Sequence, residues 1–292
     1  MSRKRIRVLH RATSLAASVL VAVANVGCNE LRVFFPAHDY ETERPALPDA
    51  LAHPALLVFT KTNGFRHSEA IEAGVPLFEA IAERLGGSAF HTESGGVFNA
   101  GDLARFDVVI WHNTSGDLLT AEQREAFRSW LEQGGGFVGV HGAGGDTSYE
   151  WDWTPTELLG AQFIGHPMGP QVQSATVLVE DRTHPATRAL PEQWEHADEW
   201  YSFAASPRER PGFRILASLD ESSYEPRFRM LWMDRDLAMG DHPVVWSHCV
   251  GRGRAIYSAL GHPAAAYREP VMRQLLEGAV TWAAGLEGDA CE

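Results

Sequence analysis

The chain has 292 residues, of which 45% are hydrophobic and 22% charged, and this is the composition of a globular protein with a sizeable core. Its formal net charge is −13 at pH 7. Such an acidic chain repels nucleic acids and anionic membranes, so we exclude nucleic acid as a partner. The charge does not exclude neutral or cationic small molecules as ligands.

Residues 1–27 have the pattern of a secretory signal peptide. Basic residues, Arg3 to Arg11, precede an apolar run over residues 12–26 that is shorter than the about 20 residues of a membrane span. Small residues before Cys28 resemble a bacterial lipoprotein cleavage site, although Asn25 departs from that pattern. We expect an exported, membrane-anchored lipoprotein, periplasmic or at the cell surface, lipidated at Cys28 and in contact with the membrane through this N-terminal lipid anchor only. The alternative is ordinary secretion with an incidental cysteine.

Residues 28–54 contain four prolines among charged residues and are predicted to form a linker or extended arm. Residues 55–286 show no internal repeat and no second linker, so they are expected to form one α/β domain.

In an oxidising compartment Cys249 and Cys291 are free to form a disulfide bridge, but the sequence leaves their pairing open.

The first half of this domain alternates strands and helices, which predicts parallel strand pairing with right-handed crossovers. A capping box, Thr120 with Gln123, marks the start of one helix. The predicted elements are a strand at 56–61, a helix at 68–85, a strand at 107–112, a helix at 120–133 and a strand at 136–140. Further strands follow at 174–180, 213–219, 229–233, 243–249 and 254–260, before a helix at 269–284.

The segment from Gly134 to Ala143 predicts a helix end, a short buried strand and a tight turn that presents His141. In α/β enzymes such a turn often carries a serine or cysteine nucleophile. Histidine is instead a base or a metal ligand, and it is poorly suited to stable acyl transfer. Gly134-x-Gly136-x-x-Gly139 also matches the dinucleotide-binding fingerprint. We reject this match, because the phosphate-binding loop of that motif follows a strand and opens a helix, whereas these glycines lead into a strand.

Polar loops follow the first three strands of the alternating half: residues 60–67, 112–117 and 141–146. The carboxyl ends of parallel strands meet at one edge of the sheet, and ligands bind at that edge in open α/β folds. We therefore expect the three loops, each with a histidine and with amide or hydroxyl groups, to converge on one pocket.

The sequence resembles the ThuA-like (trehalose utilisation) family over residues 56–284. The resemblance rests on Gly64-Phe-Arg-His67, His112-Asn113, the Gly134–His141 segment, His196-x-Asp-Glu-Trp-Tyr201 and Gly251-Arg-Gly-Arg-Ala-Ile-Tyr-Ser-Ala-Leu-Gly-His262. It implies the fold of class I glutamine amidotransferases without their catalytic cysteine: a flavodoxin-like, mostly parallel sheet with helices on both faces. Members of the family are linked to bacterial sugar catabolism, often beside dehydrogenases that make 3-keto sugars.

Position and resemblance together suggest His141, Glu199 and His262 as catalytic residues. Each has a plainer interpretation, such as a core histidine bonded to a backbone carbonyl for His141. Asp198 and Glu199 cannot both face inward along a strand, and we prefer Glu199. His166 is expected to be structural or to support the site. Residues expected to bind substrate are Arg66, His67, His112, Asn113, Asp146, Trp151 and Tyr201.

Two mechanisms are consistent with these residues. In one, His141 and His262, with His67 or Glu199, hold a divalent metal such as zinc or manganese. In the other, His141 and Glu199 are a metal-free acid–base pair acting on an oxidised or 3-keto sugar. A hydrolase, lyase or isomerase would fit either mechanism. The alternative is a non-catalytic, membrane-anchored carbohydrate-binding module. The sugar, the bond changed and the oligomeric state stay open.

Overall fold

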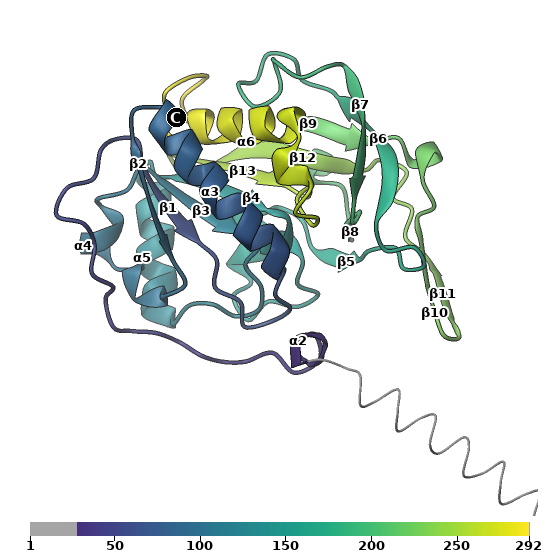
Figure 1. Cartoon of the computed structure of the whole chain (residues 1–292), viewed down its shortest axis with the longest axis horizontal. Helices are drawn as coiled ribbons and strands as arrows, with labels where there is room; N and C mark the ends of the chain where they lie inside the picture. Colours follow the sequence, from purple (N-terminus) through teal and green to yellow (C-terminus); the bar gives the residue numbers. More distant parts are fainter. Residues whose placement is uncertain (1–27, 292) are drawn as a thin grey trace, which may run out of the picture.

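A nine-stranded sheet runs through the body in the order β2–β1–β3–β4–β13–β12–β9–β6–β7 (Figure 1). The computed structural model describes residues 28–291, so the predicted signal peptide lies outside the described residues. The first five strands in this order are parallel and have the 2-1-3-4-5 arrangement of flavodoxin-like folds. They are β1 Ala55–Phe59, β2 Ser88–Thr92, β3 Val108–His112, β4 Gly136–Val140 and β13 Gly253–Ser258.

The other half of the sheet is antiparallel, because the chain there returns through loops and short turns instead of helical crossovers. Its strands are β6 Gln173–Val179, β7 Gln193–Asp198, β9 Arg214–Leu219 and β12 Pro243–Val250. The predicted α/β fold is confirmed, and its parallel strands form the half of the sheet that contains β1, β3 and β4.

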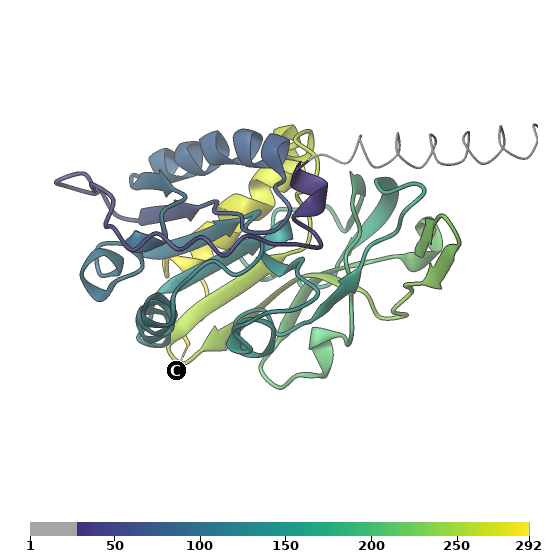
Figure 2. The same cartoon turned by 90° about the horizontal axis from the view of Figure 1, so that it is seen from below.

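Helices cover both faces of the parallel half (Figure 2). On β3, Trp111 stacks on Phe127 of α5 (Ala121–Glu132), whereas the next residue, His112, packs on Phe78 of α3 (Ser68–Arg84). Since successive side chains of a strand face opposite sides, α5 and α3 lie on opposite faces. Helix α6 (Pro270–Ala283) packs beside α3, and α4 (Ala100–Leu103) packs beside α5. The predicted capping box at the start of α5 is present.

The arm before β1 is held against the body. After the short helix α2 (Cys28–Leu31) it is irregular, and ion pairs fix it through Glu41 with Lys61 and through Arg44 with Asp102. A separate two-stranded sheet forms from β5 Phe163–Gly165 and β8 Ser202–Phe203. None of the helices within residues 28–291 is both long and apolar enough to cross a bilayer.

The strand predicted at 229–233 is wrong. This segment is a hairpin of β10 Arg227–Met230 and β11 Met233–Asp236, with Leu231 and Trp232 in the turn. Four consecutive apolar residues, 230–233, suggested a buried strand, but in the structure Leu231 and Trp232 are exposed.

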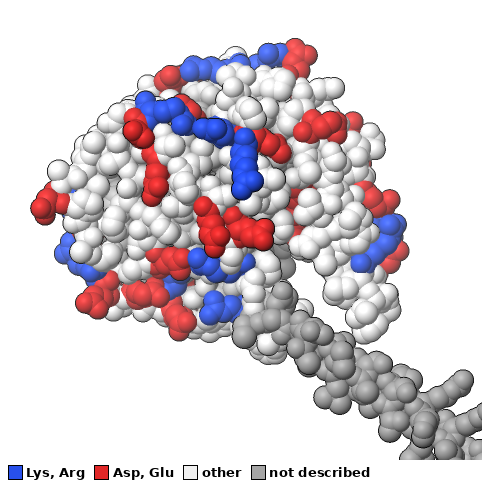
Figure 3. Space-filling model, viewed as in Figure 1, with Lys and Arg blue, Asp and Glu red and all other residues white. Residues whose placement is uncertain are grey.

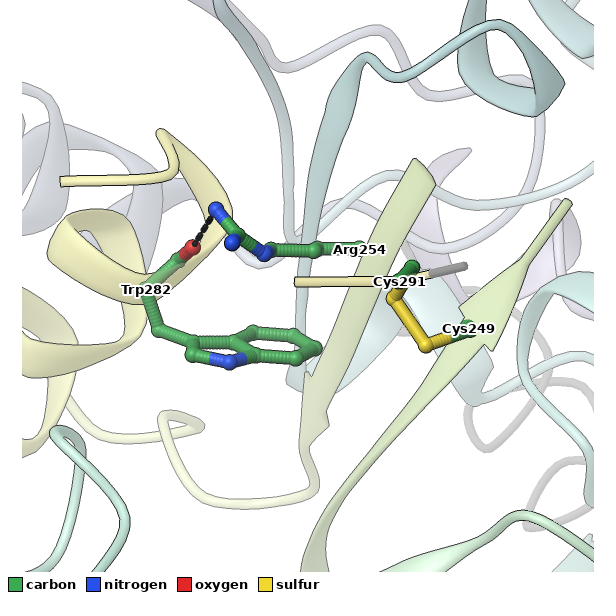
Figure 4. Close-up of a disulfide and its surroundings, with 4 residues drawn as sticks. All are labelled: Cys249, Arg254, Trp282 and Cys291. Carbon is green, nitrogen blue, oxygen red and sulfur yellow. Dashed lines mark hydrogen bonds between the residues drawn. A yellow bond between two sulfur atoms is a disulfide. The ribbon is translucent and has the colours of Figure 1, made fainter. Parts of the chain in front are cut away.

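A disulfide joins Cys249 of β12 to Cys291 in the tail that follows α6 (Figure 4). Beside it the guanidinium of Arg254, on β13, donates to the carbonyl oxygen of Trp282 at 3.3 Å. The bridge closes a loop that contains β13 and α6, so it ties the last helix to the antiparallel half of the sheet.

Candidate functional site

Three histidines and one glutamate meet at the carboxyl edge of the sheet. His67 lies between β1 and α3, His141 follows β4, His262 follows β13, and Glu199 follows β7. One side-chain nitrogen or oxygen from each lies within 4.8 Å of those of the other three. We call His67, His141, Glu199 and His262 the histidine–glutamate cluster. Residues from four separate segments thus converge on one point.

The backbone and one hydrogen bond fix the direction of His141. Its φ of 44° lies in the left-handed region, which is costly for a residue with a Cβ. Its Nδ1 donates to the carbonyl oxygen of Ala259 at 2.7 Å, and this bond turns Nε2 towards Glu199, whose Oε2 lies 3.3 Å away. The plainer interpretation of a bonded core histidine therefore accounts for only one of the two ring nitrogens.

Three buried imidazole nitrogens of the cluster have no hydrogen-bond partner: His67 Nδ1, His141 Nε2 and His262 Nδ1. The latter two each lie 3.3 Å from Glu199 Oε2, so the carboxylate is their nearest charged neighbour, at the long end of hydrogen-bond range. A buried polar atom without a partner costs roughly 1–3 kcal/mol. Three such atoms around one carboxylate indicate a site built for a ligand.

The charges of the cluster follow from its burial. Burial alone raises the pKa of Glu199, but interactions with His141, His262 and His166 outweigh it and lower the pKa below 4.5. Burial and the neighbouring histidines lower the pKa of His67 well below 6.5. Glutamate is thus ionised and His67 neutral at pH 7, the forms that bind metals.

His262 behaves differently, because the carboxylates of Glu199 and Asp198 outweigh its burial and raise its pKa above 6.5. A cation that binds to this cluster therefore competes with a proton on His262.

Asp198 holds the turn that carries His262. Its carboxylate accepts from the backbone N–H groups of Gly261 at 2.8 Å and His262 at 3.0 Å, and from that of Glu199 at 2.9 Å. His196 lies 3.0 Å from the same carboxylate. The expectation that only one of Asp198 and Glu199 faces inward is wrong, because β7 ends at Asp198 and strand alternation no longer applies.

A cavity of about 830 Å³ borders the cluster, with His67 and Glu199 in its wall. Aromatic side chains line it, among them Tyr201, whose ring lies 4.1 Å from that of His141, and Trp151. Asp146 lies in the wall and accepts from the N–H of Gly116 at 2.8 Å, and burial raises its pKa to about 7. The cavity therefore combines aromatic faces with a few polar groups.

The structure separates the predicted site residues into three groups. His67, His141, Glu199 and His262 form the cluster, and Asp146, Trp151 and Tyr201 line the cavity. Arg66, His112 and Asn113 are not among the lining residues.

Structural contacts account for each of these last three. Arg66 pairs with Glu93, and His112 Nε2 lies 3.0 Å from the carbonyl oxygen of Ala70. Asn113 accepts from the N–H of Gly142 and donates to the carbonyl oxygen of Gly261. In the structure these contacts hold the segments around the site, and the predicted substrate-binding role of the three residues stays a prediction.

Two further residues of the site lie in the loop between β5 and β6. Gln171 donates to Glu199 Oε1, and His166 Nδ1 lies 3.3 Å from the same oxygen. His166 was expected to be structural or supporting, whereas Gln171 was not anticipated. No strand-end or periodic pattern marks this loop in the sequence, so only the fold reveals it.

Comparison with known proteins gives one family. The family model ThuA, described as trehalose utilisation, matches residues 55–283. A solved ThuA-like protein from Bacteroides uniformis is similar at 27% identity and a TM-score of 0.68, covering 82% of this chain and 95% of that one. Another, from Parabacteroides merdae, shares the fold at 19% identity and a TM-score of 0.56, covering 79% and 89%. No curated protein matches. The chain belongs to the ThuA family.

Proposed function

We propose that this protein is a metal-dependent enzyme that acts on a saccharide, with the histidine–glutamate cluster as its metal site. The observation that carries the proposal is the set of three buried imidazole nitrogens that surround Glu199 without a partner. Buried polar atoms are mostly hydrogen-bonded. Single buried nitrogens without a hydrogen bond also occur at Trp111, His184 and His248, but within residues 28–291 only the cluster has three of them converging on one carboxylate.

The donor set fits a divalent metal. Three imidazole nitrogens and one carboxylate oxygen suit zinc or manganese. The separations of 3.3 Å from Glu199 Oε2 to His141 and His262 agree with the spacing of about 3.3 Å for two atoms that are each bound to one zinc ion tetrahedrally. The metal-free pair of His141 and Glu199 is less favoured, because it leaves His67 Nδ1 buried without a role.

A bound divalent metal would polarise a sugar carbonyl or lower the pKa of a water molecule. The residues of the chain then bind and orient the sugar. Tyr201 and Trp151 offer aromatic faces to the apolar face of a sugar ring. Asp146, with its pKa near 7, is able to donate or accept a hydrogen bond at a sugar hydroxyl. Gln171 keeps Glu199 in place through Oε1.

The proposed substrate is an oxidised or 3-keto sugar. A cavity of about 830 Å³ is large enough for a small saccharide. The family description, trehalose utilisation, supports a sugar ligand. A metal bound at the site would polarise the ketone carbonyl of such a sugar. Polarisation of the carbonyl would assist elimination, isomerisation or hydrolysis.

We further propose that the protein is exported and anchored to the membrane through a lipid on Cys28. The basic and apolar pattern of residues 1–27 supports export. The bridge between Cys249 and Cys291 also supports it, because disulfides persist in oxidising compartments.

Turnover and metal content together test the proposed activity. The full-length protein, loaded with zinc or manganese, is incubated with 3-keto trehalose or a 3-keto glucoside and followed by NMR. We expect turnover in the wild type, loss by at least about a hundredfold in Glu199→Gln, and no loss in Glu195→Gln, an exposed glutamate on β7. Turnover that survives complete metal removal would contradict the metal site, and sugar binding without turnover would favour the binding module.

A further inference from the structure

Two exposed apolar segments lie at the mouth of the cavity. The first begins at the last residue of α2 and contains Leu31, Val33, Phe34 and Phe35, of which the two phenylalanines are 73% and 77% exposed. The second is the β10–β11 turn, where Leu231 is 83% exposed and Trp232 86% exposed. We call these two segments the apolar rim. Large apolar side chains are not normally exposed in such groups on a soluble surface.

Both segments border the same cavity. Val33 and Phe34 line it from the arm, and Met230 and Met233 line it from the hairpin. Figures 1 and 2 show α2 and the β10–β11 hairpin on the same edge of the molecule. The tip of the hairpin, at the lower right of Figure 3, carries no charged side chain. The rim is therefore one discontinuous surface around an opening.

The hairpin turn is also strained. Leu231 has a φ of 56°, in the left-handed region, where a leucine costs roughly 1–2 kcal/mol. Asparagine or glycine would fill this turn without strain. The protein instead presents Leu231 and Trp232 to the surroundings, and an apolar partner for these side chains would offset the cost.

We propose that the apolar rim docks on a phospholipid bilayer, so that the cavity opens at the level of the lipid headgroups. Cys28, the expected lipid site, begins α2 and lies three residues before Leu31. A tether at this position would hold the first segment of the rim close to the membrane. The inference extends the proposed anchoring but does not rest on the chemistry of the cluster.

The composition of the rim suits a lipid interface better than a protein partner. Tryptophan, phenylalanine and leucine are the residues that settle between headgroups and acyl chains, and arginines flank them there. Arg32 lies within the first segment, and Arg229 and Arg235 lie beside the hairpin turn, where Arg229 pairs with Glu225 and Asp234. The net charge of −13 opposes binding to anionic lipid, so burial of apolar side chains has to drive the contact.

The test uses residues 28–292, which lack the predicted signal peptide, with Cys28→Ala, so that neither the signal sequence nor a lipid contributes to binding. Its binding to vesicles of phosphatidylcholine, and of phosphatidylethanolamine with phosphatidylglycerol, is measured by co-sedimentation. Quenching by lipids with brominated acyl chains reports tryptophan depth. We expect binding with quenching. Leu231→Ser with Trp232→Ser is expected to bind about a hundredfold more weakly, because each of the two large side chains contributes about a factor of ten.

Leu286→Ser is the matched control, since Leu286 is half exposed but lies after α6, away from the rim. It is expected to bind as the Cys28→Ala parent does. Phe34→Ser with Phe35→Ser tests the first segment separately, and circular dichroism verifies that each variant is folded. Absence of vesicle binding by the parent, or equal binding by all variants, would overturn the proposal. A rim-dependent dimer in sedimentation without lipid, and no vesicle binding, would identify a second copy of the chain as the occupant.

Discussion

His141 combines two features that a structural residue would not need together. Its left-handed backbone costs roughly 1–2 kcal/mol, and its Nε2 is buried without a partner. The hydrogen bond from Nδ1 to Ala259 keeps the ring in this orientation. Strain that persists at a buried polar residue is typical of a functional site, and it is the reason that we place the centre of the site here.

Asp198 is predicted to be the main positioning residue of the site. In Asp198→Asn an amide hydrogen faces backbone donors at Gly261, His262 or Glu199, so at least one buried hydrogen bond is lost. We expect the free energy of unfolding to fall by roughly 3 kcal/mol, as measured by urea denaturation.

Asp234→Asn provides the control for Asp198→Asn. Asp234 is an exposed carboxylate on β11 that pairs with Arg227, and surface pairs of this kind contribute about 0–1 kcal/mol. Equal stability of the two variants would show that Asp198 does not hold the turn of His262.

At the scale of elements, the contact between α3 and β3 is unusually close. A Cβ on Gly74 would lie 2.2 Å from Nε2 of His112 and 3.0 Å from the ring of Tyr267. Alanine normally stabilises a helix relative to glycine by about 1 kcal/mol. Here we expect Gly74→Ala to destabilise the protein by about 1–3 kcal/mol, because His112 has no free space into which to move.

Gly101 in α4 offers the matched comparison. The nearest atom to a Cβ there is Asn99 Oδ1 at 3.5 Å, so Gly101→Ala is expected to be neutral or stabilising by up to about 1 kcal/mol. Thermal unfolding of both variants by circular dichroism measures the difference. If both alanine variants were equally stable, the packing of α3 on His112 would not be as tight as described.

Local signals explain which elements were predictable. The apolar runs of β1, β3 and β4 and the capping box at Thr120 identify their elements within a residue or two. Strand β2 was missed, because Ser88–Thr92 forms an edge strand that is only half buried and carries no apolar run. The β10–β11 hairpin was misread because its turn is apolar, and only its place at the molecular surface explains that composition.

Local sequence patterns likewise predict only part of the candidate site. His141 and His262 follow strands, so sheet topology alone directs them to one edge. Gln171 and His166 lie in a loop whose path depends on the small β5–β8 pair, and no local pattern encodes that path. His112 is the last residue of β3 and Asn113 follows it, yet His112 faces α3, because strand alternation decides its direction, and Asn113 bonds to the turn at Gly261.

At the scale of the whole molecule, buried histidines set the response to acid. Burial lowers the pKa values of His112, His184 and His248 to about 4, from 6.5. The folded state therefore binds fewer protons than the unfolded state between these values, and stability decreases as the pH falls from 6.5 towards 4. Each histidine is expected to contribute a slope of about 1.4 kcal/mol per pH unit.

Urea denaturation across this pH range measures the slope. His184→Asn keeps a side-chain acceptor for the N–H of Ala186 and removes one titrating group. The slope should decrease by about 1.4 kcal/mol per pH unit. An unchanged slope would mean that His184 is protonated in the folded protein, contrary to its burial.

The central claim is that His67, His141, Glu199 and His262 form one metal site, and metal content tests it most directly. The untagged protein is incubated with zinc or manganese, dialysed and analysed by inductively coupled plasma mass spectrometry. We predict about one equivalent in the wild type and in His53→Ala, an exposed histidine distant from the cluster, and none in His141→Ala. Absence of metal from the wild type, or equal retention in His141→Ala, would contradict the account.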